Sequence, residues 1–305
     1  MRSPATLEEF FRLFPSERHC WRHLRRVRWP EGFHCPRCGH RKSHRLRPRG
    51  LEQCAACRYQ ASLTAGTPLH GTRTPLRTWF LAIFYVARHK KGISALQFQR
   101  DTGVGSYKTA WSLLHKVRST LRPRAEFRLE GLVEVDESYV GARRVPGPRG
   151  RGALGKTPVG IAVENRGDHA GAVRLQVLQG VSKEDLFPFV WGAIDGPGTT
   201  VATDGLPTYH GLRQSGVRHR RHVPRTRTET LVQLPWVHTV AGNLKTWLRG
   251  IFHGVSPKHL PRYLDEFSYR FDRRWREKEL FGFVLRRVAH GEPLLYRQLV
   301  AERAA

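Results

Sequence analysis

Two acid-bearing segments of this 305-residue chain have the residue types needed for metal chemistry. The segment GLVEVDES (131–138) alternates apolar and acidic side chains, which predicts a β-strand whose Glu134 and Asp136 point away from the apolar layer. A second predicted strand, TTVATDG (199–205), ends in Asp204. An acid at a strand end is equally typical of a solvated turn. Two carboxylates on neighbouring strands, however, repel each other without a cation, so the pair predicts a Mg²⁺ or Mn²⁺ site.

A later helix is expected to complete such a site. The segment WVHTVAGNLKTWLRGIF predicts a helix with Asn243, whose amide oxygen can bind a hard cation but brings no charge, so we expect weaker metal binding than with three carboxylates. His238 fits a substrate or metal contact and a capping or core role equally well. Lys245 lies on a different face from Asn243 and is predicted to contact DNA phosphate. Glu229 and Glu266 are rival acids, but arginines four residues to either side of Glu266 favour ion pairing there.

Four of the five cysteines have the spacing of a metal site. Cys35 and Cys38 form one C-x-x-C pair, and Cys54 and Cys57 form another after 15 intervening residues. This pattern predicts one structural Zn²⁺ held by four thiolates, with a disulfide pair or redox thiols as the alternative and nearby histidines as possible replacement ligands. Cys20 lies in a helical apolar pattern and is predicted to be buried.

The charge balance points to a polyanionic partner. The chain has 53 lysines and arginines against 25 acids, a net charge of +28. Each basic group placed on a phosphate releases a counterion, although ribosomal and membrane-surface proteins can share this balance. No run of 18 or more apolar residues and no signal-peptide pattern occur, so we expect a soluble, cytosolic protein without a membrane partner. On a phosphodiester substrate, two metal ions about 4 Å apart could activate the attacking oxygen and neutralise the leaving one.

Two basic segments are candidates for phosphate contacts. The loop between the cysteine pairs carries Arg45 and Arg47 among other cations, and a merely solvated loop is the alternative. The insert GARRVPGPRGRGALGKT, with Arg143 and Arg144, lacks periodicity and predicts a mobile basic loop between strands.

The order of elements predicts the fold. Residues 5–30 predict one or two amphipathic helices broken near Pro15, and residues 75–121 predict three helices. The last two are joined by a glycine turn, which fits a helix-turn-helix with Lys108 facing DNA, although helical hairpins that bind nothing are common. From residue 131, the order strand, strand, strand, helix, strand, helix, strand, helix matches the α/β ribonuclease H-like fold, in which the two acid-bearing strands lie side by side.

Five ordered segments together resemble the IS1595-type insertion-sequence transposases with an ISXO2-like DDE domain: CPRCGH…CAAC, VEVDESYVG, the TDG of ATDGLPTYH, VHTVAGNLKTWLRGIFHGVSPKHL and YLDEFSYRFDRR. The resemblance spans nearly the whole chain. It implies that Asp136 and Asp204 are the first two catalytic acids and that Asn243 stands where many relatives carry Glu. Three further residues near these motifs are candidate auxiliary site residues: Glu134, Glu137 and His238.

The resemblance implies a DNA transposase that binds terminal inverted repeats. Water would first free a 3′-hydroxyl, which would then attack target DNA, using two Mg²⁺ (or Mn²⁺) ions, with one structural Zn²⁺ elsewhere in the chain. The expected partners are transposon-end and target double-stranded DNA and at least a second copy of the chain, in the bacterial cytoplasm at the nucleoid. The alternatives are a catalytically inactive DNA-binding regulator and a ribonuclease H-like nuclease without strand transfer.

We predict five regions along the chain. They are an N-terminal helical segment (1–30), a zinc ribbon (31–72), a helix-turn-helix region (73–128), a ribonuclease H-like catalytic domain (129–272) with a basic insert (141–157), and a basic helical tail (273–305). The apolar residues of the tail are predicted to form a docking face: Trp275, Leu280, Phe281, Phe283, Val284 and Leu285.

Overall fold

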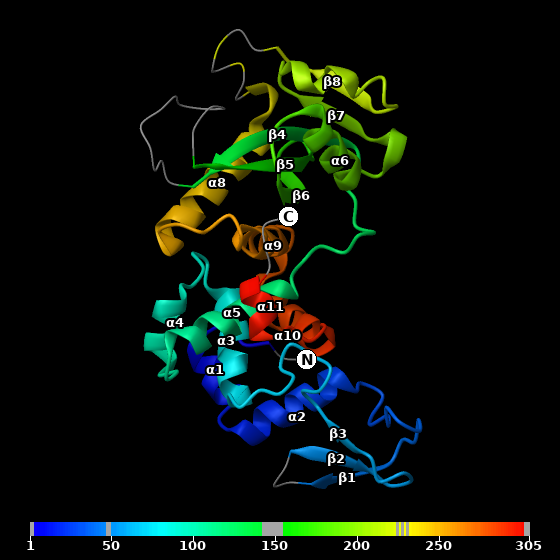
Figure 1. The fold of residues 1–305 in the computed structure, drawn as a ribbon, viewed down its shortest axis with the longest axis vertical. Coiled ribbons are helices and arrows are strands. Elements are labelled where there is room, and N and C mark those ends of the chain that lie inside the picture. Colours follow the sequence, from blue (N-terminus) through cyan, green and yellow to red (C-terminus); the bar gives the residue numbers. More distant parts are fainter. Residues whose placement is uncertain are drawn as a thin grey trace. The chain divides into compact units, whose positions relative to one another are not determined.

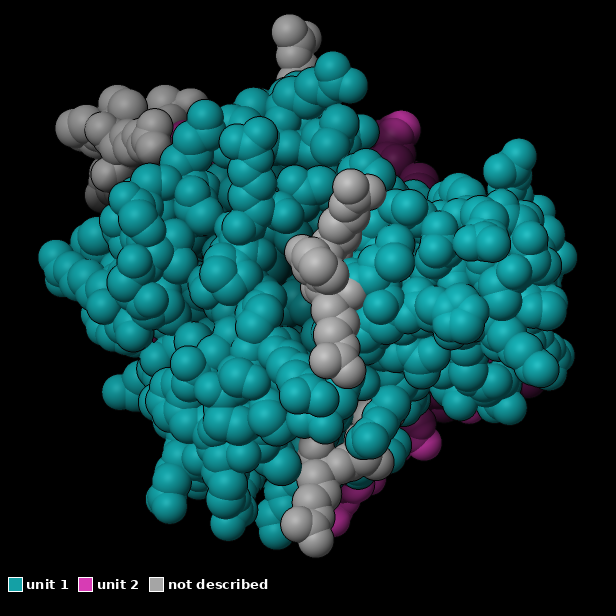
Figure 2. Space-filling model, turned by 90° about the horizontal axis from the view of Figure 1, so that it is seen from below, with its two compact units in different colours: residues 1–121, 275–302 teal, residues 122–274, 303–305 magenta. Residues whose placement is uncertain are grey.

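The computed structural model describes residues 3–46, 50–141, 155–223, 226, 229 and 232–301. The chain forms two compact units: unit 1 contains residues 1–121 and 275–302, and unit 2 contains residues 122–274 (Figure 2). Unit 1 is therefore built from both ends of the chain, and the predicted arginine contacts at Arg47, Arg143 and Arg144 lie outside the described residues.

Unit 1 combines helices with a three-stranded antiparallel sheet (Figure 1). Its elements are α1 (Leu7–Leu13), α2 (Glu17–Arg28), β1 (Ser43–Leu46), β2 (Leu51–Cys54), β3 (Gln60–Ser62), α3 (Leu76–Arg88), α4 (Ala95–Thr102), α5 (Tyr107–Ser119), α10 (Leu280–His290) and α11 (Tyr296–Ala301). The helices predicted in residues 5–30 and 75–121 are confirmed, including the break near Pro15.

Local capping signals define the helical pair α4 and α5. The hydroxyl of Ser94 accepts the backbone N–H of Gln97 at the start of α4, and the hydroxyl of Ser106 accepts that of Thr109 at the start of α5. Between them, Gly103 ends α4 with a φ of 69°, a left-handed conformation that glycine adopts at little cost. The turn and both helix starts therefore follow from the sequence alone.

Helix α10 belongs to the aromatic core of unit 1. The ring of Phe281 is fully buried, and its centroid lies 5.6 Å from that of Phe14 and 6.0 Å from that of Phe80. The predicted apolar docking face is thus confirmed for the buried residues of α10. It is wrong for Trp275, which is 76% exposed, because the preceding 3₁₀ segment η5 (Arg274–Glu279) breaks the helical phase.

Unit 2 contains a five-stranded mixed sheet in the order β6–β5–β4–β7–β8. The strands are β4 (Leu132–Val140), β5 (Thr157–Asn165), β6 (Ala170–Val177), β7 (Thr200–Thr203) and β8 (Arg218–Arg221). The pairs β4–β5 and β5–β6 are antiparallel, whereas β4–β7 and β7–β8 are parallel. The predicted mixed sheet with flanking helices, and the adjacency of the two acid-bearing strands, are confirmed.

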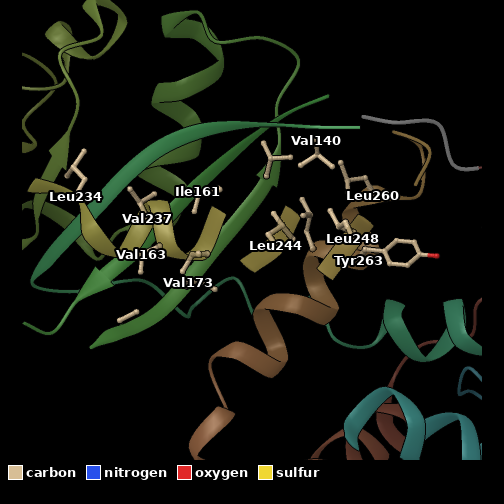
Figure 3. Packing of buried hydrophobic residues seen from close by; sticks show 14 of the residues in the cluster. Val140, Ile161, Val163, Val173, Leu234, Val237, Leu244, Leu248, Leu260 and Tyr263 are labelled. Atoms are coloured by element: carbon tan, nitrogen blue, oxygen red, sulfur yellow. The ribbon is translucent and has the colours of Figure 1, made fainter. Parts of the chain in front are cut away.

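Helices cover both faces of this sheet. Val133 and Val135 pack under α6 (Lys183–Ala193), which begins with a capping box formed by Ser182 and Asp185. On the other face, α8 (Pro235–Phe252) and α9 (Leu260–Phe271) pack against β5 and β6, and Figure 3 shows Val237, Leu244 and other side chains of α8 directed at the strands.

Asp136 points away from the layer of Val133 and Val135, as predicted, but its own face of β4 is covered by α8, so its side chain is only 19% exposed. One local expectation is wrong. The segment LPTYHGLRQSG forms only a short 3₁₀ helix, η4 (Pro207–Gly211), rather than an α-helix. Gly211 in this segment packs closely on Phe187, since an added Cβ would lie 3.0 Å from the ring. The conformation of the segment is therefore constrained by this packing contact as well as by its sequence pattern.

Candidate active site

The two predicted catalytic acids follow equivalent positions of neighbouring strands. Strands β4 and β7 pair in parallel with Glu134 opposite Ala202, and Asp136 and Asp204 each come two residues later. Each carboxylate is oriented by the backbone: Asp136 Oδ1 accepts the N–H of Glu137 and Asp204 Oδ1 accepts the N–H of Leu206, both at 2.9 Å. The acids are thus held in fixed orientations by backbone that the sheet itself defines.

Tyr209 of η4 lies close to these acids and was not predicted from the sequence. Its O–H donates to Glu137 Oε2 at 3.1 Å. Burial raises the pKa of Tyr209 well above its usual value, and the negative charges of Glu137, Asp136 and Asp204 raise it further. The pKa of this phenol therefore depends on all three carboxylates. In the sequence, only the position of Tyr209 shortly after the TDG motif could have indicated its role.

Glu137, a predicted auxiliary residue, lies on the opposite face of β4 from Asp136. Its side chain is 9% exposed and accepts the hydrogen bond from Tyr209. This arrangement makes Glu137 a support for η4, the segment that directly follows Asp204.

Glu134, another predicted auxiliary residue, anchors the first turn of α8. Its fully buried carboxylate accepts the N–H groups of Trp236 and Val237, each at 2.8 Å, and the amide of Asn165 at 2.7 Å. Burial raises the pKa of Glu134, while these hydrogen bonds oppose the rise. A carboxylate at a helix N-terminus satisfies donors that have no partner within the helix. Glu134 therefore fixes the start of α8 over the strand that carries Asp136.

His238, one turn into α8, lies beside Asp136. Its Nδ1 lies 3.5 Å from Asp136 Oδ2, and the two side chains are 24% and 19% exposed. Burial lowers the pKa of His238, the Asp204 carboxylate opposes that effect, and Lys245 adds to it. The net lowering favours a neutral imidazole at pH 7, the form that can bind a metal ion.

Lys245 lies two helical turns beyond His238 on the same side of α8. Burial lowers the pKa of Lys245, and so does Arg249, whereas Asp136 raises it. This coupling places the ammonium group within the electrostatic reach of Asp136. A cation near Asp136 is suited to a phosphate, and the phosphate contact of Lys245 stays a prediction.

Asn243, the predicted third ligand, is on another side of α8. It is exposed, while α8 buries Val240, Leu244 and Leu248 against the sheet. At 100° per residue, Asn243 lies about 140° around the helix from His238. The structure therefore places His238 beside Asp136, and it places Asn243 on another side of the helix.

The rival acids have other surroundings. Glu266 is fully buried in α9, and its Oε1 lies 3.4 Å from Arg270 Nη1, so the ion pairing predicted for it is confirmed. The backbone N–H of Glu229 donates to the Thr226 hydroxyl at 3.1 Å.

The donor set fits a divalent cation. Two carboxylates and a neutral imidazole are ligands that Mg²⁺, Mn²⁺ and related ions accept. Among the described residues, buried His238 Nε2 has no hydrogen-bond partner. Asp136 and Asp204 are the charged residues that would hold the ion.

The four cysteines of unit 1 converge as predicted. Their sulfur atoms all lie within 4.8 Å of one another, and the Cys35–Cys57 and Cys38–Cys54 sulfur pairs are 3.6 Å apart. Tetrahedral zinc with bonds of about 2.3 Å separates its sulfur ligands by about 3.8 Å. The cluster therefore has the dimensions of a closed, structural zinc site.

The described candidates for DNA contact in unit 1 both lie against aromatic rings. The guanidinium of Arg45 lies 3.6 Å from the Trp21 ring centroid, and Lys108 Nζ, at the exposed start of α5, lies 4.3 Å from that of Tyr296. These contacts orient the cations without neutralising their charge.

Comparison with known proteins finds two family matches, one in each unit. Residues 128–272 match the ISXO2-like transposase domain, and residues 15–60 match the transposase zinc-ribbon domain. The chain is also 29% identical over 280 residues to an uncharacterized protein in transposable element ISH50 of Halobacterium salinarum, covering 84% of this chain and 91% of that protein. Among the described residues, no helix is both long and apolar enough to cross a bilayer.

Proposed function

From the premise that this chain belongs to the IS1595 family of ISXO2-like transposases with a zinc ribbon, we propose that it binds insertion-sequence terminal inverted repeats and catalyses metal-dependent DNA cleavage and strand transfer. The observation that carries the proposal is the placement of Asp136 and Asp204 on adjacent parallel strands, with the imidazole of His238 at 3.5 Å from Asp136. No simple DNA-binding module needs such a cluster.

Asp136 and Asp204 would hold the divalent metal, Mg²⁺ or Mn²⁺. Bound there, two ions would activate the attacking oxygen and neutralise the leaving oxygen of a phosphodiester. The backbone N–H groups of Glu137 and Leu206 keep the two carboxylates in place for this task, so little reorganisation is needed when metal binds. The third place in the triad is assigned by sequence to Asn243.

Lys245 would bind the phosphate of the strand that is cut. Its burial beside Asp136 keeps it within the site, where the charge of a phosphodiester compensates the cost of holding an ammonium group there.

Unit 1 would recognise the DNA ends. The zinc ribbon and the pair α4–α5 carry exposed cations, including Lys108, and the whole chain carries a charge of +28. Arg45, Arg47, Arg143 and Arg144 are proposed as further phosphate contacts. Since two ends must be joined, we expect at least two copies of the chain on DNA, in the cytoplasm at the nucleoid. The related ISH50 protein comes from Halobacterium salinarum, so the comparison does not support the predicted bacterial origin of this chain.

The test is cleavage and joining of a DNA that carries the element's terminal repeats. We expect nicking and strand transfer with Mg²⁺ or Mn²⁺, and a loss of at least about a thousandfold in Asp204→Ala and Asp136→Ala, because either change removes a charged metal ligand. Asp168→Ala changes an acid of unit 2 with an 89% exposed side chain and serves as the matched control.

Two other outcomes define the alternatives. End binding without any cleavage by the wild-type protein would indicate an inactive regulator. Cleavage without joining would indicate a ribonuclease H-like nuclease.

A further inference from the structure

We propose that the edge strand β8 binds the sugar–phosphate backbone of DNA beside the two acids, with Arg218 and Arg220 as its phosphate contacts. The inference rests on the proposed function and deepens it, since it names a surface that would hold the substrate near Asp136 and Asp204. This surface is separate from the DNA contacts proposed for unit 1, because β8 belongs to unit 2.

Strand β8 occupies the edge of the sheet next to Asp204. In the described part of the chain it is the outermost strand, and it pairs in parallel with β7, the strand that leads to Asp204 (Figure 1). The backbone N–H of His222 donates to the carbonyl of Thr203 at 2.8 Å, so the pairing continues to the residue before Asp204. Neighbouring strands lie about 4.8 Å apart. The sequence of β8, RHRR, therefore brings three arginines close to the strand end that carries the second acid.

Two of these arginines share a face of the sheet with the first acid. Arg220 pairs with Ala202, which pairs with Glu134, and residues in register point to the same face. Side chains two positions apart also share a face, so Arg218 joins Arg220 there. Asp136 shares the face with Glu134 by the same rule. The two arginines and the acid therefore line one side of the sheet.

This part of the face is open to solvent. Helix α8 packs mainly on β4 and β5, and the side chains of Arg218 and Arg220 are exposed. In the part of the chain that the structure describes, neither arginine forms an ion pair with an acid. Cations without an acidic partner attract a polyanion, and each one that binds a phosphate releases a counterion.

The spacing of the two arginines fits a DNA strand. Residues i and i+2 of a β-strand lie about 6.6 Å apart, and successive phosphates of one DNA strand are about 3.4 Å apart along the helix axis. Two arginines at this distance can therefore contact separate phosphates. Backbone contacts carry no sequence information, so β8 should position DNA without reading its bases.

Charges on an edge strand can also have a protective role. Exposed charged side chains keep the unpaired edge of a sheet from pairing with a second copy of the chain. That role can use either face of the strand, whereas phosphate binding beside the acids requires the face of Asp136. Arg221 separates the two roles, because it points to the opposite face, where its Nη1 is 2.9 Å from His210 Nε2.

The experiment measures DNA binding by the full, zinc-loaded chain by fluorescence anisotropy, at several salt concentrations and without added divalent metal. Two duplexes are compared, one that carries a terminal repeat and one of shuffled sequence. The variants are Arg218→Ala, Arg220→Ala, the double alanine variant and the double lysine variant, with Arg221→Ala as the matched control. Circular dichroism verifies that each variant is folded, and size-exclusion chromatography measures self-association.

We expect each single variant to weaken binding about three- to tenfold, by the same factor on both duplexes, because a backbone contact is lost. The double alanine variant should reduce the slope of log K against log salt by about 2, since each phosphate contact contributes about 0.9. The double lysine variant keeps both charges and should retain most of the affinity. Arg221→Ala should stay within about twofold of the wild type.

The inference is overturned if the double alanine variant binds both duplexes as tightly as the wild type, or if Arg221→Ala weakens binding as much as Arg218→Ala. A loss confined to the terminal-repeat duplex would also contradict it, because that result would indicate base contacts. Normal DNA binding together with self-association of the double alanine variant would show that the charges only protect the edge. If the wild-type protein binds neither duplex, the proposed function is wrong as well.

Discussion

At the scale of single residues, the positions of the four cysteines of the zinc ribbon are determined mainly by local backbone turns. Each pair is followed by a left-handed residue, Gly39 with a φ of 74° and Arg58 with a φ of 60°, which turns the backbone around the sulfur atoms. The fifth cysteine, Cys20, is fully buried, and burial raises its pKa to about 12, so it stays a protonated thiol. The two kinds of cysteine should differ in chemistry.

A change at one zinc ligand should therefore remove the metal, whereas a change at Cys20 should not. We expect about one zinc per chain in the wild type and in Cys20→Ala, and a loss of zinc and of ribbon folding in Cys35→Ser, since three thiolates and a hydroxyl bind zinc far more weakly than four thiolates. Elemental analysis by mass spectrometry gives the zinc content. Full zinc occupancy in Cys35→Ser would contradict the assignment.

At the scale of elements, the position of α8 decides whether the site can form. Its apolar face packs on β5 (Figure 3), but packing alone does not fix where the helix begins. The buried carboxylate of Glu134 does so, because two backbone N–H groups of the first turn donate to it. An acid of the strand that carries Asp136 thus positions the helix that brings His238 beside Asp136.

Removing this anchor should cost stability and disturb the site together. We expect Glu134→Ala to lower the free energy of unfolding by about 2 kcal/mol or more, because it leaves buried donors without an acceptor. Glu134→Gln keeps an acceptor oxygen and should cost less. Urea unfolding followed by circular dichroism measures both, with exposed Glu126→Ala as the control. Equal stability of Glu134→Ala and the control would refute the anchoring role.

At the scale of the whole molecule, unit 2 is inserted into unit 1 along the chain. The segment 275–302 returns to the N-terminal helices, where Arg28 donates to the carbonyl of Ala289 and His290 Nε2 lies 3.0 Å from the carbonyl of Val27. The C-terminal segment is therefore a structural part of the unit that carries the zinc ribbon.

Loss of one aromatic ring in α10 should thus affect the zinc-bearing unit. We expect Phe281→Ala to destabilise unit 1 by about 3–5 kcal/mol, because it leaves a cavity in the aromatic core. Zinc release on heating reports unfolding of unit 1 and should move to a lower temperature. Trp275→Ala, at a 76% exposed side chain, is the matched control and should have little effect. An unchanged release temperature in Phe281→Ala would show that α10 is dispensable.

Much of the fold could be predicted because its signals are local. Ser94, Gly103 and Ser106 define the ends of α4 and α5, and the capping box at Ser182 starts α6. Cysteine spacing indicated the zinc ribbon, and the acids of two predicted strands indicated Asp136 and Asp204. Each of these signals acts within a few residues of the chain, so no knowledge of packing is needed to interpret it.

The sequence by itself determined the two acids, the four sulfur ligands and the order of strands and helices, because side-chain type and periodicity encode them directly. Only the tertiary structure decided that His238 faces Asp136, that Glu134 is a buried helix anchor, and that α10 completes unit 1. These three facts depend on the rotation of α8 about its axis and on contacts across more than one hundred residues of chain. The sequence period predicts which side of a helix is apolar. Which residues contact the other sides of the helix depends on the elements against which the apolar side packs.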